Sequence, residues 1–307
     1  MTAKRGGIAL LGLLSVAPVL AWSFGLGSFR AWFLATTAPS ALALIVVALT
    51  TRDERLRAAM VAGAAGGVFG TLGYDVFRVP FVVAGLRLFA PIESYGVLLT
   101  GAHSSRPATA FAGWAYHLSN GVGFGIAYGM VAYGRRKWWA VLWAMVLESA
   151  TVLTPFATMY GLRGKYDLIA IAYAAHLFYG LPLGYVVENK LRLPAARMIG
   201  VAVLALAVWL RPWSVPGATR DGERAAPGPS AVVRDGRFSP GWLRLGKGEC
   251  ALIRNDDATA YPLPKQKVTL EPGRTTSVCF GKVGVIRVKT SSKPYSGGFV
   301  IVERHPR

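Results

Sequence analysis

Long apolar stretches dominate the first two thirds of the chain. Seven of them have roughly the 20 residues, at about 1.5 Å each, that a helix needs to cross a bilayer. They are residues 8–26, 31–50, 56–74, 108–133, 138–158, 166–187 and 196–213. The pattern predicts an α-helical multi-pass membrane bundle of about seven helices over residues 1–213.

Two apolar segments need separate treatment. Residues 79–101 are interrupted by Arg87, Pro91 and Glu93, so we expect an interfacial or re-entrant piece there rather than a span. The first stretch follows Lys4 and Arg5, as a signal sequence does, but no small-x-small cleavage site follows it. We therefore expect it to remain as a helix.

The pattern changes after Trp213. Residues 214–230 are rich in Pro, Gly and charged residues, which predicts a flexible linker. From Ala231 onward, short stretches alternate apolar and polar positions between Gly and Pro, as strands do. The expected strands are 231–234, 242–246, 250–254, 275–280, 284–289 and 299–303. They predict a small all-β sandwich over residues 231–304.

Composition and charge support an integral protein of the cell (inner) membrane. Only 16% of residues are charged, against about 25% in soluble domains. With the N-terminus inside, the cytoplasmic loops carry 11 Lys and Arg and the opposite loops carry 6. This positive-inside bias, with an odd number of spans, places the C-terminal domain outside the cytoplasm. The net charge of +19 comes with no zinc-finger or RNA-binding motif, so we expect no nucleic-acid partner.

Three segments of the C-terminal part resemble a cupredoxin. They read FSPGWLRLGKGECALIRND, LEPGRTTSVCFGKVG and GVIRVKTSSKPYSGGFVIV. The Phe-x-Pro turn, the Leu-x-Pro-Gly turn and the last hairpin follow the family's spacing without gaps inside each segment. The resemblance covers residues 231–304 and implies a cupredoxin-like fold. The membrane part resembles no family that we recognise.

The resemblance also implies that the copper site is lost. Type 1 copper needs two His, a Cys thiolate and a weak axial Met. The positions that correspond to these ligands hold Tyr261, Thr290, Lys293 and Ser296. None of these side chains supplies the required nitrogen or sulfur, so we expect no copper and no resident cofactor in this domain.

The family's alternation of inward and outward positions also places the only two cysteines. Ala251 and Ile253 correspond to inward positions, and so does Val278, which leaves Cys250 and Cys279 on the outward face. The family pairs these two strands, so a cross-strand disulfide is expected, with two free thiols as the alternative.

Ionisable residues within the apolar stretches are candidates for function, because charges in a bilayer are costly. His117, Glu148 and His176 lie midway along three consecutive stretches, with Asn120 one turn from His117. Three roles are open: hydrogen bonds between helices, a metal or haem ligated through the histidines, or a pathway for protons or a ligand.

A short pattern surrounds both histidines. His-Leu-x-x-Gly-x-x-x-Gly begins at His117 and again at His176. A small-x-x-x-small face allows close helix packing, and transporters often contain internal repeats. The third stretch carries Gly66-x-x-x-Gly70 and is expected to end at Tyr74 and Asp75.

These observations lead to one expected function and one alternative. The C-terminal part is basic, with 14 Lys and Arg against 6 Asp and Glu over residues 230–307. We expect a non-catalytic membrane subunit whose β-domain docks another membrane or extracytoplasmic protein. The alternative is an intramembrane metal or haem redox protein, or a transporter, that uses His117, Glu148 and His176. The sequence contains no P-loop, Rossmann, nucleophile-elbow or kinase motif, so no enzyme class is predicted.

Overall fold

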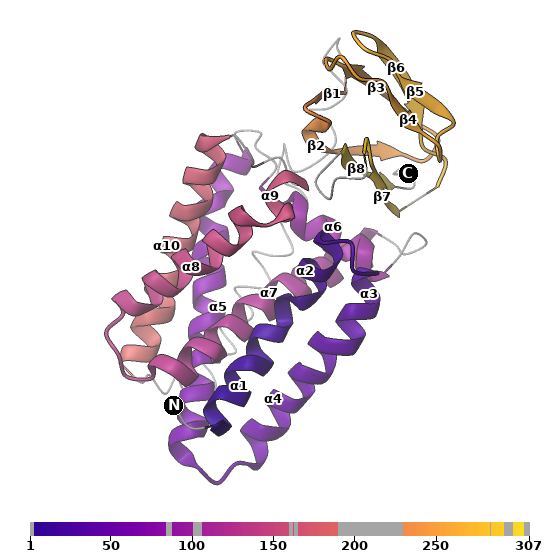
Figure 1. The fold of residues 1–307 in the computed structure, drawn as a ribbon. Helices are drawn as coiled ribbons and strands as arrows, with labels where there is room; N and C mark the ends of the chain where they lie inside the picture. The colour runs from indigo at the N-terminus through magenta and orange to yellow at the C-terminus, as the bar shows by residue number, and fades with distance from the viewer. Residues whose placement is uncertain are drawn as a thin grey trace.

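The computed structural model describes residues 3–83, 88–100, 106–159, 162, 165–189, 230–282, 284–291 and 297–303. A helical N-terminal part is followed by a small strand-containing C-terminal part (Figure 1). The seventh apolar stretch, 196–213, and residues 214–229 of the expected linker lie outside the described residues.

The helical part contains ten α-helices within the described residues. They are α1 (Ala3–Leu13), α2 (Ala17–Ser23), α3 (Phe29–Trp32), α4 (Ala38–Thr50), α5 (Glu54–Val83), α6 (Ala90–Thr100), α7 (Arg106–Ala132), α8 (Trp138–Leu153), α9 (Pro155–Met159) and α10 (Tyr166–Glu188). A 3₁₀ turn, Leu14–Val16, joins α1 to α2, and a π-helical turn, Phe33–Thr37, joins α3 to α4. Through these junctions α1 and α2 form one continuous span, and α3 and α4 form another.

Four helical spans of the described residues are long and apolar enough to cross a membrane. They are Ala3–Ser23, Phe29–Thr50, Glu54–Val82 and Tyr166–Glu188. The second of these spans has an apolar outward surface, since Leu42 and Leu49 of α4 are 63% and 75% exposed. The shorter apolar helix α8 has one too, with Leu142 53% exposed. Because water disfavours such surfaces, these helices belong in a membrane.

Proline explains the break in the first span. Pro18 has no N–H, so it cannot donate to the carbonyl of Leu14 four residues earlier. The Thr37 hydroxyl lies 3.4 Å from Leu14 O and 3.2 Å from Ser15 O, and the Tyr116 hydroxyl donates to Ser15 O at 3.0 Å. The Ala17 N–H also donates to Leu14 O, so the carbonyls at this break have partners, as a bilayer requires.

The expected end of the third helix at Tyr74 and Asp75 is wrong. Helix α5 continues through Pro80 to Val83, so that Asp75 and Arg78 lie inside it. Both side chains are buried, and Arg78 donates to Asp75 at 2.7 Å across one helical turn. Because the two charges neutralise each other, the apolar helix can continue past them. Hydropathy alone predicts that it ends there.

Two further boundaries also differ from the expected ones. The described parts of 79–101 form the end of α5 and the short helix α6, which packs against α7. The fifth stretch, expected as 138–158, breaks at Thr154 into α8 and α9. Pro155 accounts for this break, because the residue before a proline avoids the helical conformation.

The C-terminal part contains eight strands within the described residues. They are β1 (Ala231–Arg234), β2 (Arg237–Gly246), β3 (Cys250–Asn255), β4 (Tyr261–Leu263), β5 (Val268–Leu270), β6 (Thr275–Cys279), β7 (Gly284–Val288) and β8 (Gly297–Glu303). Six form one sheet in the order β6-β3-β1-β2-β8-β7, and β4 pairs with β5. The sequence predicted six of them; β4 and β5 are only three residues long, and Pro262 within β4 is unfavourable in a strand.

The expected disulfide is confirmed. Cys250 and Cys279 are register partners in the antiparallel β3–β6 pair and are bonded to each other. Ala251 and Ile253 of β3 and Val278 of β6 are fully buried, and the cysteines lie on the exposed face. The bond spans 29 residues in sequence, and a loop of that size contributes about 3 to 4 kcal/mol.

The β-strands lie at one end of the helical part (Figure 1). Strand β7 contacts α6, and β2 and β8 contact α9. A Cβ at Gly25, in the turn between α2 and α3, would lie 3.5 Å from Arg287 Nη1 of β7. The C-terminal part therefore rests on the ends of the helices that surround the cavity described next.

Candidate functional site

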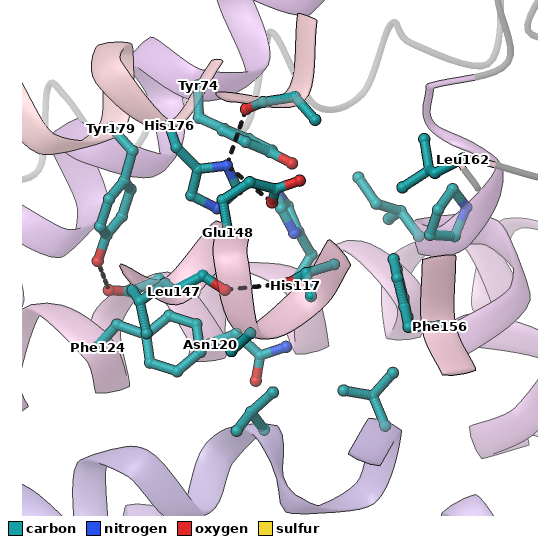
Figure 2. A pocket seen from close by; sticks show the side chains of 18 of the residues that line it. Tyr74, His117, Asn120, Phe124, Leu147, Glu148, Phe156, Leu162, His176 and Tyr179 are labelled. Carbon is teal, nitrogen blue, oxygen red and sulfur yellow. Dashed lines mark hydrogen bonds and ion pairs between the residues drawn. The ribbon is translucent and has the colours of Figure 1, made fainter. Parts of the chain in front are cut away.

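The four polar residues singled out from the sequence line one cavity. His117 and Asn120 come from α7, Glu148 from α8 and His176 from α10 (Figure 2). The cavity has a volume of about 450 Å³ and lies between the helices. At one end it is lined by Phe156 of α9 and Leu162 (Figure 2), and the exposed residue Lys165 also lines it.

The first pair within this site joins α7 to α5. His117 Nε2 lies 3.1 Å and 3.2 Å from the two carboxylate oxygens of Asp75. Arg78 donates to Asp75 Oδ1 at 2.7 Å and to the carbonyl of Leu88 at 2.9 Å. Asp75 therefore has a charged partner on its own helix and an imidazole on the next.

The second pair joins α8 to α10. His176 Nδ1 lies 3.1 Å from Glu148 Oε2 and 3.0 Å from the carbonyl of Ala172, one turn earlier on its own helix. The Glu148 side chain is only 3% exposed. Because Nδ1 faces both oxygens, the other ring nitrogen, Nε2, is the atom left for a ligand or a proton.

Tyr74 of α5 lies between the two pairs. Its ring centroid is 5.9 Å from that of His117 and 4.8 Å from that of His176, and the Arg78 guanidinium lies 4.2 Å from the ring centre. The residues on α5, α7, α8 and α10 thus form one connected cluster (Figure 2).

Sequence reasoning missed Asp75 and Arg78 as members of this cluster. They follow the 56–74 stretch, and the drop in hydropathy placed the helix end at their position. The available signal was their spacing: an acid and an arginine three residues apart face the same side of a helix and can neutralise each other.

Glycines bring α7 and α5 into close contact beside the first pair. A Cβ at Gly125 would lie 2.8 Å from the backbone nitrogen of Gly67, and Gly121 meets α5 at the same helical face. His117 lies one turn before Gly121 and reaches Asp75, eight residues after Gly67. The glycine contact therefore sets the distance across which the histidine and the carboxylate meet.

The same arrangement recurs between α10 and α8. A Cβ at Gly180 would lie 2.8 Å from the carbonyl oxygen of Ala140. A Cβ at Gly184 would meet the backbone of Lys137, the residue before α8. His176 lies one turn before Gly180 and reaches Glu148, eight residues after Ala140. Glu148 is therefore the positional equivalent of Asp75, and His176 that of His117.

The equivalence extends to a repeated helical unit. Each unit consists of a helix with the carboxylate, a shorter helix and a helix with the histidine: α5-α6-α7 and α8-α9-α10. The first helix of the second unit is the shorter of the two, with 16 residues against 30. The units differ three residues after the carboxylate, where the first has Arg78 and the second has Thr151. Glu148 consequently has no arginine on its own helix at the position where Asp75 has one.

Three polar atoms of the cluster are buried without a hydrogen-bond partner. They are Glu148 Oε1, Asn120 Oδ1 and Arg78 Nε. Buried polar atoms are normally satisfied, because each unmet hydrogen bond costs about 1–3 kcal/mol. Glu148 and Asn120 both line the cavity, so their unmet acceptor oxygens are available to a polar ligand.

The arrangement does not suit the metal or haem alternative. Among the described residues, no three His, Cys, Asp or Glu side chains come together as ligands of one metal ion. Each histidine is paired with a different carboxylate, and the Tyr74 ring lies against both imidazoles. The two histidines are therefore not arranged as a pair of axial ligands.

Tyr261 and Thr290, two of the four residues that the sequence resemblance aligns with copper ligands, take part in internal hydrogen bonds. Thr290 Oγ donates to Gly236 O, and the Tyr261 hydroxyl donates to Asp257 Oδ2 at 2.8 Å. Partial burial opposes ionisation of Asp257, but the Gly236 N–H, the Tyr261 hydroxyl and the Asp235 N–H together hold its pKa below the ordinary value. Lys293 and Ser296 lie outside the described residues.

Comparison with known proteins gives no relative. No protein-family model, curated protein or solved structure matches this chain.

The Glu148–His176 contact leads to a prediction on stability. Glu148→Gln and His176→Ala are each expected to destabilise the protein by about 1–3 kcal/mol. His176→Ala leaves the buried Glu148 carboxyl without its partner, and Glu148→Gln replaces a charge-assisted hydrogen bond by a neutral one. The double variant should lose less than the sum, with a coupling of about 0.5–3 kcal/mol. Thermal unfolding of the purified protein measures all three.

A distant pair serves as the control for this coupling. Glu148→Gln combined with Asp256→Asn, an exposed residue of the β-domain, should be additive within about 0.5 kcal/mol. Additivity for Glu148 and His176 as well would contradict the contact.

Proposed function

We propose that this chain is a membrane transporter that binds a small solute between its helices and couples the movement of that solute to the binding and release of protons. One observation carries the proposal: two equivalent carboxylate–histidine pairs, from two repeated units, contribute His117, Glu148 and His176 to the lining of a single cavity. Transporters commonly place their substrate site between internal repeats, near the middle of the membrane. Carboxylate–histidine chains at that depth are typical of proton relays.

Access to the cavity from both sides of the membrane tests this function without knowledge of the solute. Both cysteines of the chain are in the disulfide, so a new thiol is labelled without background. Thr151→Cys places a thiol on the cavity wall. We expect a small membrane-impermeant methanethiosulfonate to label it in right-side-out and in inside-out vesicles.

Leu142→Cys is the matched control on the same helix, because Leu142 is exposed on the outer face of the bundle and its thiol would face lipid. It should not react with a water-borne reagent. Labelling of Thr151→Cys from one side only would leave a binding pocket without transport, and no labelling from either side would contradict the proposal.

The C-terminal part supports a second candidate function, that of a docking domain. We propose that it is a cupredoxin-like domain outside the cytoplasm that contacts an acidic partner protein. Its support is the net charge of +8 over residues 230–307 and the filling of two former copper positions by internal hydrogen bonds. The β3–β6 pairing, which the resemblance implied, also supports it. Charge reversal of Lys265, Lys267 and Lys289 should release such a partner from native membranes if this surface binds it.

The side of the membrane is predicted from loop charge. A reporter enzyme that is active only outside the cytoplasm, fused after Arg307, should be active, and one that is active only inside should not. The reverse result would contradict the proposed orientation.

Absence of a copper site gives a further prediction. The full chain with added Cu(II) should show no intense blue absorbance, because Tyr261 and Thr290 replace a His and a Cys ligand. The variant with Tyr261→His, Thr290→Cys, Lys293→His and Ser296→Met is expected to gain colour. Blue colour in the unmodified chain would show that other residues bind the metal.

A further inference from the structure

The charges around the cavity do not balance. Arg78 is permanently charged, and it is paired with Asp75 at 2.7 Å. Glu148 has only the imidazole of His176, and Thr151 stands where an arginine would neutralise it. With both histidines neutral, the described cluster within the bundle carries one uncompensated negative charge, located at Glu148.

A bilayer does not tolerate such a charge without a partner. Either a proton, held by Glu148 or by His176, or a cation from outside must neutralise it. The other charged groups near the cavity do not supply it: Arg78 and His117 are engaged by Asp75, and Lys165 is exposed at the cavity's end. Glu148 Oε1 is buried and has no hydrogen-bond partner, so it is the oxygen that remains for this ligand.

The residues that line the cavity indicate the chemistry of the rest of the ligand. Aromatic rings line it, namely Tyr74, Tyr95, Phe124, Phe156 and Tyr179, and most of its other lining side chains are aliphatic. Aromatic faces attract organic cations, and more strongly where water is excluded. The volume of about 450 Å³ lies in the range of sites for drug-sized molecules.

We propose that the cavity binds an amphipathic organic monocation, which takes the place of the proton at the Glu148–His176 pair. This inference rests on the proposed transport function and names its substrate class. One positive charge enters as one proton leaves, so the charge within the membrane stays constant. The unpartnered Asn120 Oδ1 accepts a hydrogen bond from a ligand that has an N–H or O–H group.

Three probes that share a benzene ring with a compact branched substituent test the charge requirement. They are phenyltrimethylammonium, its neutral isostere tert-butylbenzene and the anion 4-tert-butylbenzoate. A bound ligand raises the unfolding temperature of the full chain in detergent. We expect the cation alone to do so, and its apparent affinity to rise by up to about tenfold per pH unit while the site still holds the proton.

Two variants locate the charge. Glu148→Gln keeps the shape of the side chain and should weaken binding of the cation at least about 30-fold. This factor is the lower end of the cost of removing one member of a buried charged pair. Thr151→Arg supplies the guanidinium that the first unit has and should also abolish binding. Glu54→Gln, an exposed change of the same kind at the start of α5, should leave the affinity unchanged.

Each outcome decides the inference. Loss of cation binding in Glu148→Gln but not in Glu54→Gln supports it, whether or not Thr151→Arg folds. Two results would overturn the proposal of a monocation: unchanged binding of the cation in Glu148→Gln, or stabilisation by the neutral or the anionic probe alone. In either case the protein could still transport another solute. If none of the three probes binds, the monocation is also overturned, and labelling of Thr151→Cys decides the transport function separately.

Discussion

Replacement of Gly125 by valine is expected to abolish the folded helical bundle. A Cβ at this position would lie 2.7 Å from the Cα of Gly67 and 2.8 Å from its nitrogen, both backbone atoms of α5. Backbone atoms cannot move aside as a flexible side chain can, so α5 and α7 would have to separate. The separation would also pull His117 away from Asp75. We expect a loss of more than about 4 kcal/mol, which is exceptional for one substitution.

Unfolding in detergent, followed by near-ultraviolet circular dichroism, measures this effect. Gly7→Val is the matched control, because a Cβ at Gly7 in α1 would have nothing within 4 Å. The control should unfold close to the unmodified protein. An unchanged transition for Gly125→Val would mean that α5 and α7 do not pack through these glycines.

Asp75→Asn is expected to cost about 3–5 kcal/mol. The substitution removes the charge that Arg78 faces at 2.7 Å and leaves the guanidinium buried in the bundle with the Leu88 carbonyl as its remaining strong acceptor. Removal of one partner from a buried ion pair has a cost of about this size, since the other charge stays without compensation. The same unfolding measurement gives the value.

A second substitution separates this loss of charge balance from a general effect of altering the site. Arg78→Met has a similar length and no charge, so the double variant Asp75→Asn, Arg78→Met should recover a large part of the stability. If the double variant is as unstable as the sum of the single ones, the pair does not act through charge compensation. The cation experiments on Glu148 are independent of this result.

Several features of the protein follow from the sequence because they depend on local pattern. A run of apolar residues needs a helix in a membrane wherever its neighbours lie. The change to alternating positions at Ala231 likewise indicates strands. The placement of Cys250 and Cys279 on one face came instead from the family resemblance. His117, Glu148 and His176 could be selected as candidates because each is an ionisable exception in an apolar run. Their high cost in a bilayer makes such exceptions conspicuous.

Other features depended on which helices become neighbours. In the sequence, Asp75 and Arg78 resemble the end of a span. The structure shows that Asp75 pairs with Arg78 and also with His117, 42 residues away. The glycine pattern after each histidine predicted close helix packing, but it did not predict which helices meet. Only the packing of α7 on α5 and of α10 on α8 makes Asp75 and Glu148 equivalent. Through that equivalence, Thr151 is seen to stand where Arg78 stands in the first unit, which leaves the Glu148 charge without an arginine. The sequence alone could not show this, because charges in a membrane are neutralised by side chains that meet in space.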